Sequence, residues 1–299
     1  MKRFHRSLAV AAALLAAIIV QQAYAIGPPT KPNPILFGTT GACNSEIQGG
    51  PCTTQSTLVQ INPDTGQLIR KIGPVGYTVN GLAWDPTSGK LYATTPPGDT
   101  KFHGLITINP LTGRGKPVNP KAVNFGLAGV GSPVHSIAID VFGHMVGWYD
   151  EFPPPDSYVR IDKRTGIATE FGDTDINTSQ DGVAFGEFNL LWNIDSPRLQ
   201  DNGELTQTAY ILNPFDGKPL SSRLLTPPTA AALGDFNPAD NLYYGLNFDT
   251  SAPRPFPTFI VVVNPIEGTV TPFGQTVDDL HTLAFVKGRA MLPPWWSNP

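Results

Sequence analysis

Ile61-Asn62-Pro63-Asp64-Thr65-Gly66 is the first copy of a short motif that recurs through the chain. The later copies are Ile108–Gly113, Ile161–Gly166, Leu212–Gly217 and Val263–Gly268. Their glycines lie 47 to 53 residues apart, and each copy follows an apolar run suited to a β-strand. Asn or Asp, usually with Pro, opens a tight turn, and Gly supplies a positive φ at its close. The motif therefore predicts a hairpin turn that returns in every unit of about 50 residues.

A second motif alternates with these turns and predicts the innermost strand of each unit. Its copies are Gly81–Trp84, Ser136–Ile139, Gly182–Phe185, Gly234–Phe236 and Thr282–Phe285. Four of them are followed by a short turn and another β run, as in Lys90–Ala93. Each unit thus holds four short strands, which we name A to D, and this pattern is typical of propeller blades.

The number of units predicts how the fold closes. The N-terminal part opens with a B-type strand, Ile35–Thr40, that has no A strand before it. We expect Leu283-Ala284-Phe285 to supply the missing strand, because closure of the ring removes exposed sheet edges. The sequence therefore predicts an all-β fold: a single five-bladed β-propeller of four-stranded antiparallel blades over residues 26–292, whose N- and C-terminal strands share one blade. Six blades are the alternative, whereas separate β-sandwich domains do not explain a period carried from end to end.

The repeats resemble a known class of proteins. Gly81-Leu82-Ala83-Trp84-Asp85-Pro86 with Lys90–Thr94, and Val59–Gly66, are similar to the repeats of YVTN-type, WD-like secreted β-propellers. The resemblance covers nearly the whole chain after residue 25. It implies the fold but no particular function, because these motifs form turns and strands.

Composition agrees with many short strands. The 299 residues include 31 Pro and 30 Gly, which disfavour long helices. The chain is also 40% hydrophobic with five Trp, so wholesale disorder is excluded. Residues 293–299 form a Pro- and Trp-containing C-terminal tail.

The N-terminus has the pattern of a signal peptide. Lys2, Arg3 and Arg6 precede the apolar run Leu8–Val20, and Ala23-Tyr24-Ala25 provides a cleavage site. The alternative is a signal anchor, but this run is shorter than the roughly 20 residues that span a bilayer. We expect residues 1–25 to be removed, leaving an exported protein without a transmembrane segment, in the periplasm or outside the cell.

Charge and cysteines fit that location. Without residues 1–25 the chain carries 17 Lys and Arg against 24 Asp and Glu, a net charge of −7, which argues against nucleic acid as a partner. Cys43 and Cys52 flank a short loop and are predicted to form a disulfide. A metal site with two Cys ligands is the alternative.

Loop lengths indicate where a ligand would bind. The A–B and C–D turns are short, whereas the B–C connections, such as Ser196–Thr208, and the D–A connections are long. In a four-stranded antiparallel blade, both kinds of long connection emerge on the same side of the disc. Binding residues concentrate on loops held by a rigid scaffold, so this side is the predicted binding face. The alternative is that these Pro-rich loops only cover the ends of the sheets.

Polar residues at the start of the A strands are the candidate site. Asn80, His135, Asp181 and His281 precede four of these strands, and Asp235 stands where the other blades have Ala. Two His and two Asp that converge on the channel could hold a divalent metal or act as acid and base, with His135 and His281 as the metal ligands. The alternative is that they hydrate a water-filled channel. Trp148 and Tyr149 are a further candidate, as an aromatic platform for a sugar or peptide.

No motif in the sequence specifies a reaction, so we expect a binding module for a protein or glycan and predict no cofactor. The alternative function is a glycoside- or lactone-type hydrolase or lyase at the channel mouth, with Asp181 and Asp235 as acid and base. The sequence identifies neither the ligand nor the oligomeric state.

Overall fold

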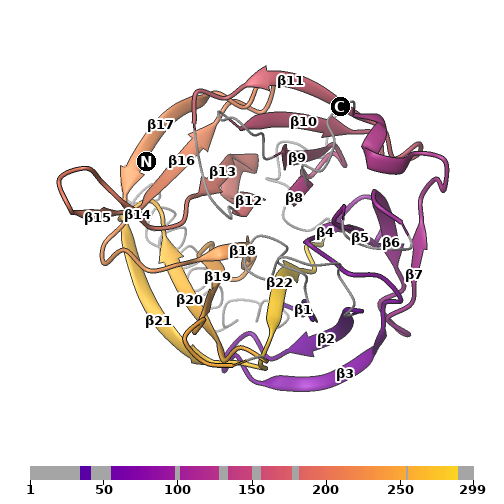
Figure 1. The fold of residues 1–299 in the computed structure, drawn as a ribbon, viewed down its shortest axis with the longest axis horizontal. Coiled ribbons are helices and arrows are strands. Elements are labelled where there is room, and N and C mark those ends of the chain that lie inside the picture. The colour runs from indigo at the N-terminus through magenta and orange to yellow at the C-terminus, as the bar shows by residue number, and fades with distance from the viewer. Residues whose placement is uncertain are drawn as a thin grey trace, which may run out of the picture. The chain divides into compact units, whose positions relative to one another are not determined.

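A computed structural model describes residues 34–41, 55–97, 102–127, 134–149, 156–176, 182–253 and 255–288 (Figure 1). These residues form five four-stranded antiparallel sheets around a central channel. The predicted five-bladed β-propeller is therefore confirmed. Residues 1–25 and 293–299, Cys43, Cys52 and Asp181 lie outside the described residues, so the predictions about them are not tested.

The blades follow one another along the chain, and within each blade the strands run in order from the innermost to the outermost. Blade 1 consists of β22 (Leu280–Phe285), β1 (Leu36–Thr40), β2 (Thr57–Ile61) and β3 (Leu68–Pro74). Blade 2 consists of β4 (Gly81–Asp85), β5 (Lys90–Thr94), β6 (Leu105–Ile108) and β7 (Gly115–Pro117). Blade 3 consists of β8 (Val134–Ile139), β9 (Met145–Tyr149), β10 (Ser157–Ile161) and β11 (Ala168–Asp173).

The last two blades have the same order of strands. Blade 4 consists of β12 (Gly182–Phe185), β13 (Leu191–Ile194), β16 (Thr208–Leu212) and β17 (Pro219–Leu224). Blade 5 consists of β18 (Ala232–Phe236), β19 (Tyr243–Phe248), β20 (Thr258–Asn264) and β21 (Thr269–Gln275). The A strands β22, β4, β8, β12 and β18 are neighbours around the channel.

The two ends of the described chain close the ring. Strand β1 pairs with β22 in antiparallel register, Leu36 opposite Phe285 and Phe37 opposite Ala284. This is the closure that the repeat count predicts. It leaves blade 1 with the same four strands as the other blades, and no blade lacks its innermost strand.

The repeated turns have the conformation that their residues predict. Gly66, Gly113, Gly166, Gly217 and Gly268 all have positive φ, between 70° and 78°. In the first turn, Asn62 Oδ1 accepts a hydrogen bond from the Asp64 amide at 2.8 Å, and the Gly66 amide donates to the Asn62 carbonyl at 2.8 Å. The Asn or Asp side chain thus folds back on its own turn, as in an Asx-turn.

Side chains of each A strand alternate between the two neighbouring blades, so the core is divided among the blade interfaces. In β4, Leu82 packs with residues of blade 1, whereas Ala83 packs with residues of blade 3. Five buried apolar clusters result, and each spans two adjacent blades. The cluster between blades 5 and 1 contains Leu36, Tyr244 and Phe285, so the closing strand is part of the core.

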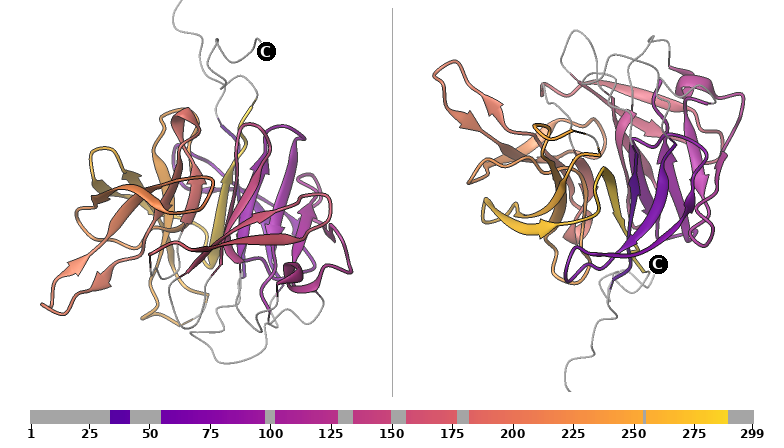
Figure 2. Two further views of the ribbon diagram at one scale, coloured as in Figure 1. Left: turned by 90° about the horizontal axis from the view of Figure 1, so that it is seen from above. Right: turned by 60° about the horizontal axis from the view of Figure 1, so that its bottom comes forward.

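One element was not predicted from the sequence. The B–C connection of blade 4 contains a two-stranded hairpin, β14 (Arg198–Leu199) with β15 (Leu205–Thr206), which projects away from the sheets (Figure 2). Its strands are too short for the periodicity of the sequence to reveal. Two 3₁₀ turns, η1 (Val123–Gly126) and η2 (Glu187–Asn189), complete the described elements. Within the described ranges, no helix is long and apolar enough to cross a membrane.

The closing strand should matter to stability as much as any other core strand. Phe285 is fully buried and packs edge to face on Tyr244, with ring centroids 5.3 Å apart. We expect Phe285→Ala to lower the free energy of unfolding by about 3–5 kcal/mol, measured by denaturant titration. Leu111→Ala is the control, because Leu111 is 79% exposed, and its effect should stay within about 0.5 kcal/mol. Equal effects of the two variants would contradict the closure.

Candidate functional site

The two ends of the channel differ in their connections. The A strands end at the short A–B and C–D turns, and we call this side the short-turn face. The A strands begin at the opposite side, where the B–C and D–A connections emerge, and we call it the long-loop face. The sequence predicts binding on the long-loop face.

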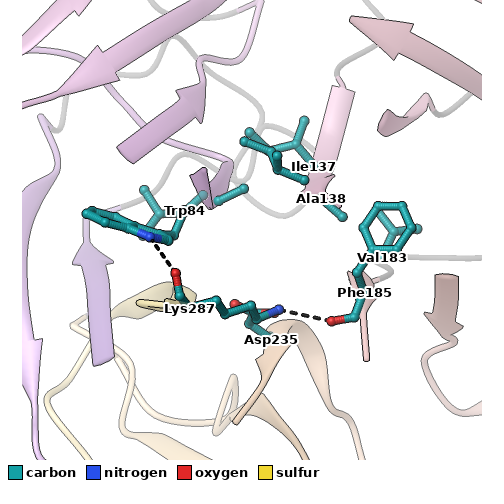
Figure 3. Close-up of a pocket in the computed structure, with 11 residues that line it drawn as sticks. Trp84, Ile137, Ala138, Val183, Phe185, Asp235 and Lys287 are labelled. Atoms are coloured by element: carbon teal, nitrogen blue, oxygen red, sulfur yellow. Dashed lines mark hydrogen bonds and ion pairs between the residues drawn. The ribbon is translucent and has the colours of Figure 1, made fainter. Parts of the chain in front are cut away.

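At the short-turn end, a small cavity lies between the A strands (Figure 3). Lys287, two residues beyond the end of β22, lies across it. Its Nζ donates to the Phe185 carbonyl at 3.0 Å and to Asp235 Oδ1 at 2.6 Å, while the Trp84 indole N–H donates to its carbonyl at 3.1 Å. This one residue therefore connects blades 1, 2, 4 and 5 at the short-turn end of the channel.

Asp235 is the other half of this contact. It stands opposite Tyr244 in β19, in the register of Ala83, Ala138, Ala184 and Ala284, as predicted from the repeats. Its Oδ2 accepts from the Phe285 amide at 2.9 Å, and its Oδ1 accepts from the Phe236 amide at 2.8 Å as well as from Lys287. The structure thus brings Asp235 to the closing strand and to Lys287. Its carboxylate has its hydrogen-bonding capacity used within the protein.

The buried Asp85 is satisfied in the same way on the short-turn face. It accepts hydrogen bonds from the Thr87 hydroxyl at 2.7 Å and the Ser88 hydroxyl at 2.6 Å, and it pairs with Lys163 from the neighbouring blade. Burial alone would raise the pKa of Asp85, but the hydrogen bonds from Lys163, Ser88 and Thr87 outweigh it and lower the pKa to about 2.

The long-loop end is different, because buried polar atoms there lack partners. Among the described residues, these atoms include Oδ1 of Asn80, Oγ1 of Thr94, Nε2 of His103, both amide atoms of Asn193 and Oγ1 of Thr276. Asn80 precedes an A strand, and His103 precedes a C strand. Thr94 and Asn193 lie at or near the end of B strands, and Thr276 follows a D strand. All of these positions belong to the long-loop face. Unpaired buried polar groups are uncommon in folded proteins, so their gathering at one end calls for an explanation.

Three consecutive blades contribute polar groups at this end. A Cβ built on Gly81 would lie 2.8 Å from Thr94 Oγ1 and 2.9 Å from the His135 carbonyl. Next to His135, the Ser136 hydroxyl accepts from the Val183 amide at 3.0 Å, and Val183 pairs with Asn193. We call Asn80, Thr94, His135, Ser136 and Asn193 the polar arc. Four of its members are buried and His135 is half-buried.

The remaining sequence candidates are distributed as follows. His281 lies in β22, half-buried, with its ring tilted against Phe248 at 5.7 Å between centroids. The structure places Gly81, the residue after Asn80, against the His135 carbonyl, and it brings Asp235 to Lys287. Within the described ranges, no group of three or more His, Cys, Asp or Glu side chains is arranged to hold a metal ion. Metal binding by His135 and His281 remains untested.

The predicted aromatic platform lies inside the fold. Trp148 is fully buried between blades 3 and 4, and its indole N–H donates to Asp156 Oδ2 at 3.2 Å. Tyr149 is 5% exposed and packs between blades 2 and 3. Both aromatic rings therefore pack in the core at their positions on β9.

Sequence reasoning missed two residues that the structure makes prominent. Asn193 stands in the register where the other blades have Gly38, Ala93, Gly147 and Gly245, so an alignment of the B strands would have singled it out. Lys287 could not be found by such an alignment. It follows the last A strand, where the repeat offers no equivalent position for comparison.

Comparison with known proteins gives little beyond the fold. No protein-family model matches the chain, and no curated protein matches it. Among solved structures, the chain is similar to TolB from Acinetobacter baumannii, with 13% identity and a TM-score of 0.48. The match covers 87% of this chain but only 57% of the TolB chain.

Asp235 and Lys287 form an ion pair, which we call the clasp, and their contributions to the free energy of unfolding should be coupled. We expect Lys287→Met to lower the free energy of unfolding by about 3 kcal/mol, because it leaves a buried carboxylate with amide partners only. In a double-mutant cycle with Asp235→Ala, the two effects should be non-additive by about 1–3 kcal/mol. The exposed pair Lys218 and Asp175 is the control and should show coupling near zero. Additive effects at Asp235 and Lys287 would contradict a clasp.

His103 should make the fold sensitive to acid. It is 9% exposed, its ring packs edge to face on Phe125 at 5.8 Å, and burial lowers its pKa from 6.5 to about 4. The unfolded chain binds a proton at higher pH than the folded one does, so stability is lost as the pH falls from 6.5 towards 4. We expect this loss to be on the order of 3 kcal/mol and to be absent in His103→Phe. Denaturant titrations of both proteins between pH 7 and pH 4 test this, and parallel pH profiles would contradict it.

Proposed function

We propose that this protein is an exported binding module that holds a partner through its long-loop face. The observation that carries the proposal is that buried polar groups have hydrogen-bond partners at one end of the channel and lack them at the other. At the short-turn end, Asp85 and Asp235 have full sets of partners within the chain. At the long-loop end, Asn80, Thr94 and Asn193 keep buried atoms without any. A group buried without a partner costs free energy, and a ligand that supplies the missing hydrogen bonds explains why it is kept.

The hairpin β14–β15 supports the same face. It arises from a B–C connection, and its paired residues Leu199 and Leu205 are 74% and 47% exposed. An isolated two-stranded hairpin is marginal in water, and exposed leucines on it gain free energy when a partner covers them. The hairpin is therefore suited to extend a contact beyond the channel.

Export is part of the proposal and is supported by the sequence. The positive residues Lys2, Arg3 and Arg6, the apolar run Leu8–Val20 and the cleavage pattern Ala23-Tyr24-Ala25 are typical of a secretory signal. The partner is then a component of the periplasm, the cell surface or the medium.

Matched surface variants test which face binds. The labelled protein would be incubated with the envelope and secreted fractions of the producing cells, and its retention measured. We expect Leu199→Asp to reduce retention several-fold, because it places a charge in the contact. Leu111→Asp and Phe215→Asp are controls on the short-turn face with similar exposure, at 79% and 71%. Loss of retention in the controls with no effect of Leu199→Asp would overturn the proposal.

A further inference from the structure

The side chains of the polar arc carry hydrogen-bonding groups but no carboxylate, ammonium or guanidinium, and this composition indicates the class of ligand. Its side chains are two amides, two hydroxyls and one imidazole, contributed by Asn80, Asn193, Thr94, Ser136 and His135. We propose that the arc binds hydroxyl groups of an uncharged carbohydrate or polyol. This inference rests on the proposed binding role of the long-loop face and names the ligand of that face.

Asn193 is the centre of the argument because of its position in the repeat. In the corresponding register the other blades have Gly38, Ala93, Gly147 and Gly245, and a Cβ on any of these three glycines would clash with the chain. At Gly147 it would lie 2.7 Å from Val134, and at Gly245 it would lie 2.4 Å from the Ala231 carbonyl. In blades 1, 3 and 5, a register shift at the start of the A strand accompanies this crowding. The described residues of β12, Gly182–Phe185, pair with β13 in continuous register, and Asn193 stands opposite Val183.

The amide of Asn193 is buried and makes no hydrogen bond within the protein. The residue is 0% exposed, yet neither Nδ2 nor Oδ1 has a hydrogen-bond partner. A side-chain amide presents a donor and an acceptor side by side. Two neighbouring hydroxyl groups of a sugar or polyol can each donate or accept, and they match this pair. Thr94 and Asn80, two blades away along the arc, offer one more unpaired oxygen each.

Charge argues against an ionic ligand at the arc. Among described carboxylates of low exposure, Asp85 pairs with Lys163, Asp235 with Lys287, Asp140 with His144 and Asp195 with Arg198, while Asp156 accepts a hydrogen bond from the Trp148 indole N–H. The arc itself contributes no carboxylate and no Lys or Arg. A charged ligand would lose its hydration there without meeting an opposite charge, whereas a neutral hydroxyl exchanges water for Asn and Thr at little electrostatic cost.

The experiment uses the exported chain and carbohydrate probes of known composition. An array of neutral mono- and oligosaccharides, with glucuronate and sialylated sugars as charged comparators, is probed first. A bound sugar is then titrated calorimetrically as its methyl glycoside. We expect neutral sugars to bind, acidic ones to be excluded, and Asn193→Ala and Thr94→Val each to weaken binding about tenfold or more. Gln67→Ala, an exposed amide side chain directly after the C–D turn of blade 1 on the short-turn face, is the matched control and should bind as the wild type does.

Thermal stability separates a ligand role from a structural one. Ala is the natural residue at this register in blade 2, so Asn193→Ala should leave the melting temperature unchanged or raise it while binding is lost. A lower melting temperature with unchanged sugar binding would assign Asn193 to the fold and overturn the inference. A blank array would overturn it as well. If the Leu199-dependent retention by envelope or secreted fractions persists in that case, the binding role of the face stands with a protein partner, and only the carbohydrate assignment fails.

Discussion

The antiparallel pairing of β1 with β22 is the contact on which the rest of this fold depends. Each blade buries its two faces against its neighbours, so no blade has a complete core until the ring is closed. Closure joins residues about 250 positions apart, such as Leu36 and Phe285, whose sequence separation makes the pairing entropically expensive. Two features stabilise the closed ring where its ends meet: the apolar cluster between blades 5 and 1, and the ion pair of Lys287 with Asp235. Stabilisation has its largest effect on the fold at this position.

The same closure explains why the two ends of the channel have different chemistry. Lys287 follows β22 directly, so the residue that completes the ring also lies across the short-turn end and satisfies Asp235. The long-loop end has no such segment among the described residues. Its A strands start from connections of unequal length, and its polar side chains therefore need not be matched by the fold itself. The ligand that we propose for this face would supply partners for Asn80, Thr94 and Asn193.

Much of this architecture could be predicted from local chemistry. The five repeated turns, four of them Asn-Pro-x-x-Gly and one Asp162-Lys163-Arg164-Thr165-Gly166, all have positive φ at the glycine, as their residues predict. The missing A strand of blade 1 comes from Leu283–Phe285, as the repeat count predicts. The site was harder to predict. Asp235 was found by its departure from Ala, yet its partner Lys287 lies 52 positions away with no repeat equivalent. Trp148 and Tyr149 were predicted as an aromatic platform for a ligand, and the structure buries both, because the alternation of β9 turns them towards neighbouring blades.

In a repeat protein, each residue can be compared with the residues at the same position in the other blades. Asp235 and Asn193 both differ from those residues, but for different reasons. Asp235 replaces Ala and gains an ammonium group and two backbone amides as partners, so the fold itself accounts for the change. Asn193 replaces Gly or Ala and gains no partner at all. Since four blades show that the fold is complete without a polar group at this register, stability does not explain Asn193. The bound carbohydrate or polyol that we propose would account for it, because the polar arc offers uncharged donors and acceptors to hydroxyl groups.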